Sequence, residues 1–182
     1  SADVVGAVSP LLEAECMQLF DDVFDGLALK DATIRINHRG ILAGITHYLE
    51  APDRIVDFTV ALDKLDKIGP DGVFNELRDK GFDDVALNRL RPLFELSGDV
   101  MAQLDQLEEI LASQPEALTG IAHLRKTLGF LNPFKVSQLA FDITLARGLH
   151  YYTGIIFEVA PPKSVAMGSI GAGGRYDNLT AV

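Results

Sequence analysis

A long helical segment lies between two stretches that alternate like β-strands, and this order restricts the possible folds more than any other feature. From 53 to 130, apolar residues recur three or four positions apart, which is typical of amphipathic helices. Before that segment, residues 31–37 place Ile34 and Ile36 on one side of a strand. After it, residues 139–146 alternate in the same way. The order predicts an α+β protein with a helical insertion between two sheet-forming parts.

Capping and turn residues divide the chain further. Ser9 and Pro10 mark the start of a helix, because serine caps free amides and proline fits the first helical position. We expect the apolar stripe of this helix to pack, and its members are Leu12, Leu19, Phe20, Val23 and Leu27. Glycine and proline breaks predict helices at 41–49, 53–67, 71–80, 84–95, 99–112 and 116–129. The stretch 153–160 is apolar enough for a central strand.

Composition restricts the class of protein. The chain has 182 residues, of which 48% are hydrophobic, and this can fill one substantial domain or a core with a smaller domain. Charged residues interrupt every apolar run well below the roughly 20 residues of a membrane span, so we expect no membrane association. The single Cys16 cannot form an internal disulfide, which fits a cytoplasmic setting. The spacing of the four histidines and the acids predicts no metal site.

The net charge of −10 argues against a broad surface for nucleic acid. Any such contact is expected at a local basic pair, and the candidates are Arg89 with Arg91 and Arg125 with Lys126. The alternative for both pairs is a solvated helix face.

Two neighbouring glycine-rich segments, 147–154 and 171–177, hold two arginines and three tyrosines. An arginine offers a planar fork of donors to a carboxylate or phosphate, and a tyrosine hydroxyl both donates and accepts. These residue types suit a small zwitterion with a polar side group. Taken one at a time, the segments are equally compatible with ordinary strand turns carrying surface tyrosines. Strict alternation would turn Arg147 to the side of Leu145, so we expect a bulge or turn at Gly148.

Taken together, RGLHYYTG at 147–154 and GGRYD at 173–177 resemble the two histidine-binding signatures of the histidyl-tRNA synthetases, which are class II aminoacyl-tRNA synthetases. Asp3–Gly6 and Leu11–Glu15 resemble the end of the motif 2 strand and the helix after it. The resemblance implies part of a class II antiparallel-sheet catalytic core with an all-α insertion domain. Its implied divisions are residues 1–52 (first part of the core), 53–133 (insertion) and 134–182 (second part of the core, with the histidine-binding motifs).

The resemblance also implies residue roles. Arg147 would contact the histidine carboxylate and the α-phosphate of ATP, and the alternative is a salt bridge to Asp142 or Glu158. The implied histidine-binding residues are Asp3, Tyr151, Tyr152, Gly171, Gly173, Gly174 and Tyr176, with the glycines leaving space for the ligand and Tyr151 also packing. His150 stands where the family usually has aspartate or asparagine.

The activity implied by the resemblance is that of a histidine-tRNA ligase, which activates histidine with ATP and magnesium, transfers it to its tRNA and acts as a homodimer. We expect an internal fragment that lacks motif 1, the motif 2 arginine, motif 3 and the anticodon-binding domain and is inactive alone. One alternative is a fragment of the related noncatalytic regulatory subunit of ATP phosphoribosyltransferase, against which Arg147, Tyr152 and Tyr176 argue. Another is a helical interaction domain attached to a small sheet.

Overall fold

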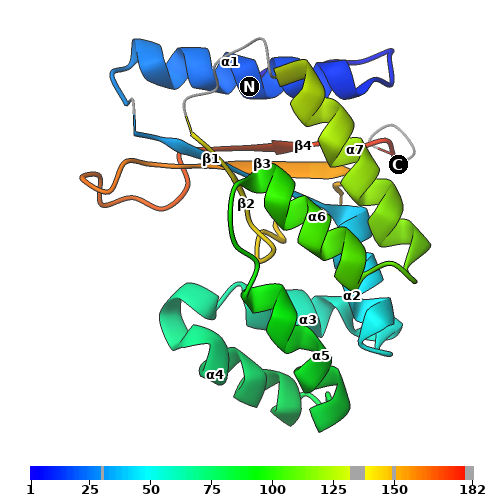
Figure 1. Cartoon of the computed structure of the whole chain (residues 1–182). Coiled ribbons are helices and arrows are strands. Elements are labelled where there is room, and N and C mark those ends of the chain that lie inside the picture. Colours follow the sequence, from blue (N-terminus) through cyan, green and yellow to red (C-terminus); the bar gives the residue numbers. More distant parts are fainter. Residues whose placement is uncertain (30, 132–137, 149–150, 179–182) are drawn as a thin grey trace.

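The computed structural model describes residues 1–29, 31–131, 138–148 and 151–178, and Figure 1 shows their arrangement around one sheet. The sheet has four strands in the order β2-β1-β3-β4. Strand β1 pairs in parallel with β2 and antiparallel with β3, and β3 pairs antiparallel with β4. The α+β prediction is therefore confirmed, and 153–160 contains a central strand as expected. The strands are β1 (Thr33–His38), β2 (Leu139–Phe141), β3 (Ile155–Ala160) and β4 (Gly171–Gly174).

Most helices lie close to the predicted positions. The helices are α1 (Pro10–Gly26), α2 (Arg39–Tyr48), α3 (Ile55–Leu62), α4 (Leu65–Asp79), α5 (Asp84–Phe94), α6 (Val100–Ile110) and α7 (Pro115–Leu131), with a 3-10 turn at Pro52–Arg54. The helix predicted at 53–67 is divided between the 3-10 turn, α3 and the start of α4. Ser9 caps α1 by accepting a hydrogen bond from the Leu11 amide at 3.2 Å. Gly69, at φ 68°, kinks α4 where the sequence predicted a helix boundary. Within the described residues, no helix combines the length and the apolar character that a membrane crossing requires.

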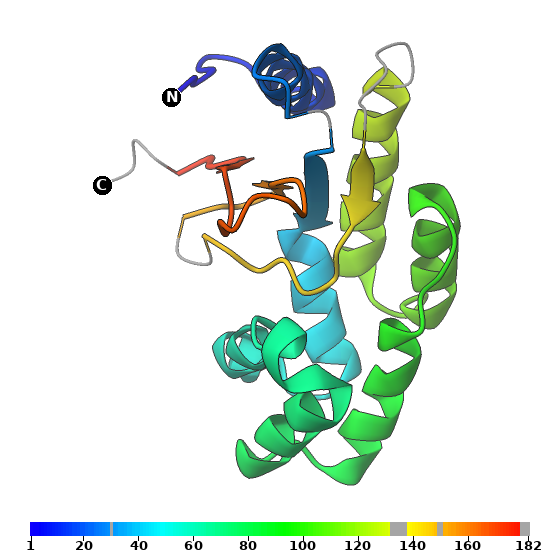
Figure 2. The same cartoon turned by 90° about the vertical axis from the view of Figure 1, so that its left-hand side faces the viewer.

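Helix α1 lies along one face of the sheet, and Figures 1 and 2 both place α3, α4 and α5 at the far end of the molecule. Phe20 of α1 packs edge to face against Phe157 of β3, with 5.3 Å between ring centroids. Phe157 pairs with Gly173 across the strands, where a Cβ atom would lie 2.3 Å from the Phe157 ring. Glycine at this position therefore lets the aromatic ring lie flat on β4.

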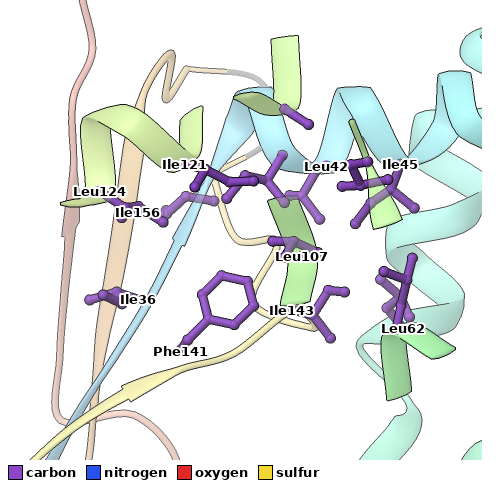
Figure 3. Close-up of a cluster of buried hydrophobic side chains, with 14 of the residues drawn as sticks. Ile36, Leu42, Ile45, Leu62, Leu107, Ile121, Leu124, Phe141, Ile143 and Ile156 are labelled. Carbon is purple, nitrogen blue, oxygen red and sulfur yellow. The ribbon is translucent and has the colours of Figure 1, made fainter. Parts of the chain in front are cut away.

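The core is one continuous cluster of apolar side chains. Figure 3 shows members from the sheet and the helices together, among them Ile36 of β1, Leu42 of α2, Leu107 of α6, Ile121 of α7 and Phe141 of β2. All five are buried, with at most 7% of their surface exposed. The two sheet-forming parts of the chain are therefore held together by helices that come from between them in the sequence.

Helix α7 packs on α2 through small residues. A Cβ atom on Gly44 would lie 2.5 Å from the Cβ of Ala117, and one on Gly40 would lie 2.7 Å from the Glu116 carbonyl oxygen. The two helix backbones can approach this closely only because α2 presents glycine there.

We expect Gly44→Ala to destabilise the fold by about 1–3 kcal/mol, because the added methyl group overpacks this contact. Gly129→Ala in α7 is the matched control, since no atom lies within 4 Å of its Cβ position. There, alanine should stabilise by about 0.5–1 kcal/mol through helix propensity. Urea unfolding of both variants measures the difference, and equal effects would show that the α2–α7 contact is not tightly packed.

Strand β2 ends before Asp142, whereas the alternation predicted that it continues past this residue. The Asp142 carboxylate accepts from the amide and the hydroxyl of Thr144, and the Leu145 amide donates to the Asp142 carbonyl, which closes a turn. The Asn37 side-chain amide donates to the carbonyls of Ile143 and Leu145 at 3.3 and 2.9 Å. Both apolar side chains stay buried, so here the alternation indicated burial and not strand pairing.

Two predictions for the N-terminal part are wrong. Asp3–Gly6, predicted as a strand end, lies outside any helix or strand, and Gly6 adopts φ +93°, which interrupts an extended chain. On α1, the side chains of Leu19, Val23 and Leu27 were expected to pack, but these residues are 45%, 47% and 63% exposed. The buried residues of α1 are instead Glu13, Ala14 and Met17.

Candidate functional site

Arg147 is presented by the turn that the sequence predicted at Gly148. Gly148 adopts φ +69°, and its carbonyl accepts from the amides of Tyr151 and Tyr152 at 3.1 and 2.9 Å. The Arg147 Nε lies 2.5 Å from Oε2 of Glu158 on β3, so one of the two predicted alternatives for this arginine is present. The Arg147 side chain is nonetheless 59% exposed, against 6% for Glu158. One ion pair leaves further donors of the guanidinium for a ligand.

Glu158 is a buried carboxylate between two arginines. Arg35, its register partner on β1, places Nη1 3.7 Å from Glu158 Oε1 and pairs more closely with Asp142, at 2.7 Å. Neighbouring strand residues alternate between faces, so Glu158 and Arg35 lie on the face opposite Phe157 and α1. Arg147 is therefore held on the sheet face that α1 does not cover.

The Tyr152 ring is seated between two glycines. A Cβ atom on Gly148 would lie 2.0 Å from Cδ2 of the ring, and one on Gly174 would lie 2.7 Å from Cδ1. The Tyr151 ring lies next to it at a tilt of 59°, with 4.4 Å between centroids. Burial, reinforced by Tyr151 and Tyr176, raises the pKa of Tyr152 to about 12. The hydroxyl is protonated at neutral pH, as it would be at the ordinary pKa of 10, and can donate a hydrogen bond.

Tyr176 and Asp3, from opposite ends of the chain, are in direct contact. The Tyr176 hydroxyl donates to Oδ1 of Asp3, and this hydrogen bond is the main cause that raises the pKa of Tyr176. Asp3 and Tyr176 also contribute to the raised pKa of Tyr152. The structure thus brings together Asp3, Tyr151, Tyr152 and Tyr176 as one polar and aromatic group, with Arg147 next to the glycine that supports Tyr152.

The glycines of 171–174 form an edge strand and not the turn that the sequence suggested. Cβ atoms on Gly171, Gly173 and Gly174 would lie 2.5, 2.3 and 2.7 Å from the rings of Phe20, Phe157 and Tyr152, respectively. Protein packing therefore explains glycine at 171 and 173, where we had expected space for a ligand. The role of the three glycines in histidine binding stays a prediction. The other position singled out in the sequence, His150, lies outside the described residues.

The two arginines of the motifs do not lie together. Arg175 directs Nη2 to within 2.7 Å of Oε1 of Glu13 on α1, and only 19% of its side chain is exposed. Gly154 provides room for it, since a Cβ atom there would lie 3.1 Å from Cδ of Arg175. Arg175 is thus turned toward α1, whereas Arg147 pairs with Glu158 on the opposite face of the sheet.

Two histidines extend this ion pair into a buried chain that the sequence did not reveal. His38 Nδ1 accepts from the Gly40 amide at 2.9 Å, which leaves the proton on Nε2 facing Nδ1 of His123 at 3.1 Å. His123 Nε2 then faces Oε1 of Glu13 at 3.3 Å. Burial alone would raise the pKa of Glu13, but the His123 hydrogen bond and the charge of Arg175 together lower it. Glu13 lies outside the apolar stripe that was predicted for α1, so no pattern in the sequence indicated it.

Burial, followed by the charge of His123, lowers the pKa of His38 from 6.5 to about 4. The other charged groups around it are Glu13 of α1, Arg39 of α2 and Arg175 after β4. The unfolded chain takes up this proton near pH 6.5, whereas the folded chain binds it only near pH 4. Protonation therefore favours unfolding inside that window, and His38 contributes no pH dependence above it.

We expect stability to fall as the pH decreases from 6.5 to 4, by on the order of 2–3 kcal/mol from this group. His38→Asn should reduce the pH dependence, because asparagine can still cap α2 and does not titrate. His47→Asn is the control, since the His47 side chain is 44% exposed. Urea unfolding at pH 7 and 4.5 compares the three proteins, and an unchanged pH slope in His38→Asn would rule out His38 as the source.

Acidic neighbours neutralise part of the two basic pairs. Arg89 pairs with Glu50 at 2.6 Å, and Arg125 pairs with Asp105 and Glu108 at 2.7 Å each. A nucleic acid would have to compete with these carboxylates, which is consistent with the acidic balance of the chain.

The comparisons with known proteins agree with one another. A family model described as histidyl-tRNA synthetase matches residues 1–182. The chain is 51% identical to a histidine–tRNA ligase of Flavobacterium johnsoniae and 48% identical to that of Christiangramia forsetii, with 100% of this chain covered in both. A crystal structure of histidyl-tRNA synthetase from Nostoc sp. PCC 7120 superposes with a TM-score of 0.86 at 28% identity, over 95% of this chain and 42% of that one.

A further solved structure, an ATP phosphoribosyltransferase regulatory subunit/histidyl-tRNA synthetase from Bacillus halodurans, has a TM-score of 0.78 at 22% identity, over 95% of this chain and 44% of that one. At this identity the likeness concerns the fold. The chain spans 38% and 40% of the lengths of the two ligases named above. Since the family model covers the chain from end to end, the chain belongs to the histidyl-tRNA synthetase family.

Proposed function

We propose that the protein containing this chain is a histidine-tRNA ligase, which activates histidine with ATP and transfers it to its tRNA. The observation that carries the proposal is the group formed by Asp3, Tyr152 and Tyr176, with Arg147 directly before the Gly148 that supports the Tyr152 ring, in a chain close in sequence to proteins named histidine–tRNA ligase. A carboxylate, two hydroxyls and a guanidinium are the groups that a histidine zwitterion can engage at once.

The group of Asp3, Tyr152 and Tyr176 would recognise the imidazole side chain of the substrate through hydrogen bonds. A neutral imidazole presents one N–H donor and one nitrogen acceptor. The Tyr152 hydroxyl, which is protonated at neutral pH, suits the acceptor nitrogen, and the Asp3 carboxylate suits the N–H. Tyr176 orients Asp3 through their hydrogen bond. Tyr151 is 57% exposed and supports the Tyr152 ring, so we assign it a packing role within the site.

Arg147 would act on the reaction itself. In histidine activation, a carboxylate oxygen of histidine forms a bond to the α-phosphorus of ATP while the bond from that phosphorus to the pyrophosphate oxygen breaks. Negative charge is concentrated between the two reactants, and a fixed guanidinium stabilises it. Glu158, itself buried, holds the Arg147 Nε in place while the rest of the fork stays accessible.

ATP would enter as a substrate with magnesium. Among the described residues, no group of three or more histidine, cysteine or acidic side chains is placed to hold a metal ion. The tRNA for histidine, a homodimeric assembly and a cytoplasmic location complete the proposal for the whole protein.

We further propose that residues 1–52 and 134–182 belong to the catalytic core and that 53–133 is the inserted part. Helix α7 is the last helix of the proposed insertion, and it packs against α2 of the proposed core through Gly44 and Ala117. This packing supports α7 as the attachment of the insertion to the core. Residue 133 lies outside the described residues.

The test is ATP–pyrophosphate exchange by the full-length protein with each natural amino acid in turn. A ligase is expected to show exchange that depends on histidine and on no other amino acid. The alternative, a noncatalytic regulatory subunit of ATP phosphoribosyltransferase, predicts no exchange with any amino acid. Absence of exchange in a folded protein that binds histidine would therefore decide for the alternative.

A further inference from the structure

The ion pair between Glu13 and Arg175 lies behind the proposed site, on the side of the sheet that faces α1. Glu13 is 7% exposed, and its carboxylate faces both Arg175 at 2.7 Å and His123 at 3.3 Å. Three elements that are distant in the sequence meet at this carboxylate, namely α1, α7 and the residues after β4. The position of this buried carboxylate is restricted, because moving away from Arg175 or His123 would leave a buried charge without its partner, which costs free energy.

Arg175 stands between two residues of the proposed histidine site. Gly174 before it lies against the Tyr152 ring, and Tyr176 after it donates to Asp3. The Arg175 backbone is fixed as well, because its amide donates to the Ile155 carbonyl at 3.0 Å and its carbonyl accepts from the Thr153 amide at 2.8 Å. The Glu13 ion pair thus adds a third, side-chain attachment at Arg175, the residue that precedes Tyr176.

We propose that Glu13 is a positioning residue of the histidine site: its carboxylate holds Arg175, and Arg175 thereby fixes its two chain neighbours, Gly174 and Tyr176. The inference rests on the proposed function for its kinetic consequences. Glu13 touches no substrate in this account and acts through Arg175. His123 of α7 contacts the same Glu13 carboxylate, so the helical segment also contributes to the geometry of the site.

Glu13→Gln in the full-length protein separates this role from a merely structural one. Glutamine keeps the size of the side chain and removes the charge that attracts Arg175. We expect the KM for histidine to rise about tenfold, the effect of losing one charge-assisted contact, with the KM for ATP unchanged within about twofold. General loss of stability would reduce the amount of active enzyme and leave both KM values where they are. Glu15→Gln, the same change at an exposed position of α1, is the matched control.

A double-mutant cycle tests the route through Tyr176. If Glu13 acts by placing the Tyr176 hydroxyl, then Glu13→Gln should add little to the histidine KM once Tyr176→Phe has removed that hydroxyl. Additive effects of the two substitutions on the KM, or equal changes in the KM values for histidine and ATP, would overturn the positioning role.

Amide hydrogen exchange gives a readout that needs no ligand. In Glu13→Gln, the amides of Thr153 and Arg175 should exchange at least about tenfold faster, while amides that join β1 to β3 keep their protection. A uniform change along the chain, or none, would overturn the inference. If the unmutated protein shows no histidine-dependent ATP–pyrophosphate exchange, the proposed function is overturned instead. The amide hydrogen exchange measurement then decides on the positioning role alone.

Discussion

Arg147→Ala in the full-length protein is expected to slow formation of histidyl-adenylate by about 10²-fold or more, the usual effect of removing one preorganised donor from a developing charge. Its guanidinium is well placed for this, because it is held by Glu158 through Nε while 59% of the side chain is exposed. Arg147→Lys should restore little of the rate, since an ammonium group lacks the planar fork. Single-turnover measurements with saturating histidine and ATP give the rate directly.

Arg78→Ala is the matched control for this prediction. The Arg78 side chain is 53% exposed and pairs with Asp84 at 3.0 Å, so it resembles Arg147 in exposure and in having a carboxylate partner. It lies in α4, at the end of the molecule away from the sheet (Figure 1). Its adenylate rate should equal that of the unmutated protein. If Arg147→Ala also retains the normal rate with an intact fold, the Glu158 pair is its whole role.

The elements of the fold could be predicted where local patterns determine them. Ser9 and Pro10 specify the start of α1 by capping, and Gly69 marks a kink because it adopts a positive φ. Strand β2 was predicted too long, because alternation reports which side chains are buried and cannot distinguish strand pairing from the turn closed by Asp142. The parallel pairing of β1 with β2 is a long-range property that no local pattern contains.

The site could be predicted only in part for a similar reason. The resemblance of the motifs implied Tyr152, Tyr176 and Asp3, and the structure brings the three into one group. Residue type could not tell which arginine faces the site, because the direction of a side chain on a strand depends on where the strand begins. Glu13 was missed since its partners are a histidine more than a hundred positions away and an arginine at the other end of the chain.

Removing either hydroxyl from the tyrosine pair should weaken histidine binding specifically. In Tyr152→Phe and Tyr176→Phe the ring remains, so the packing of Tyr152 on Gly148 and Gly174 is retained and folding should barely change. When a polar group of the ligand or the site loses its hydrogen-bond partner, the affinity typically falls roughly 5- to 150-fold. We expect the apparent affinity for histidine to fall by that factor in each variant, with the ATP dependence nearly unaffected, because neither hydroxyl is assigned to a phosphate.

The two variants should also differ from each other in a way that the structure specifies. Tyr176→Phe removes the donor to Asp3 and leaves a carboxylate that is free to move, whereas Tyr152→Phe leaves that hydrogen bond in place. The larger loss is therefore expected for Tyr176→Phe. Tyr48→Phe at the end of α2, where the ring contacts Arg89 instead of the site, provides the matched control and should leave both affinities unchanged. Apparent affinities for histidine and ATP, measured separately by pyrophosphate exchange, check all three proteins. Normal histidine affinity in both site variants, or a loss of ATP affinity in its place, would mean that these tyrosines only pack.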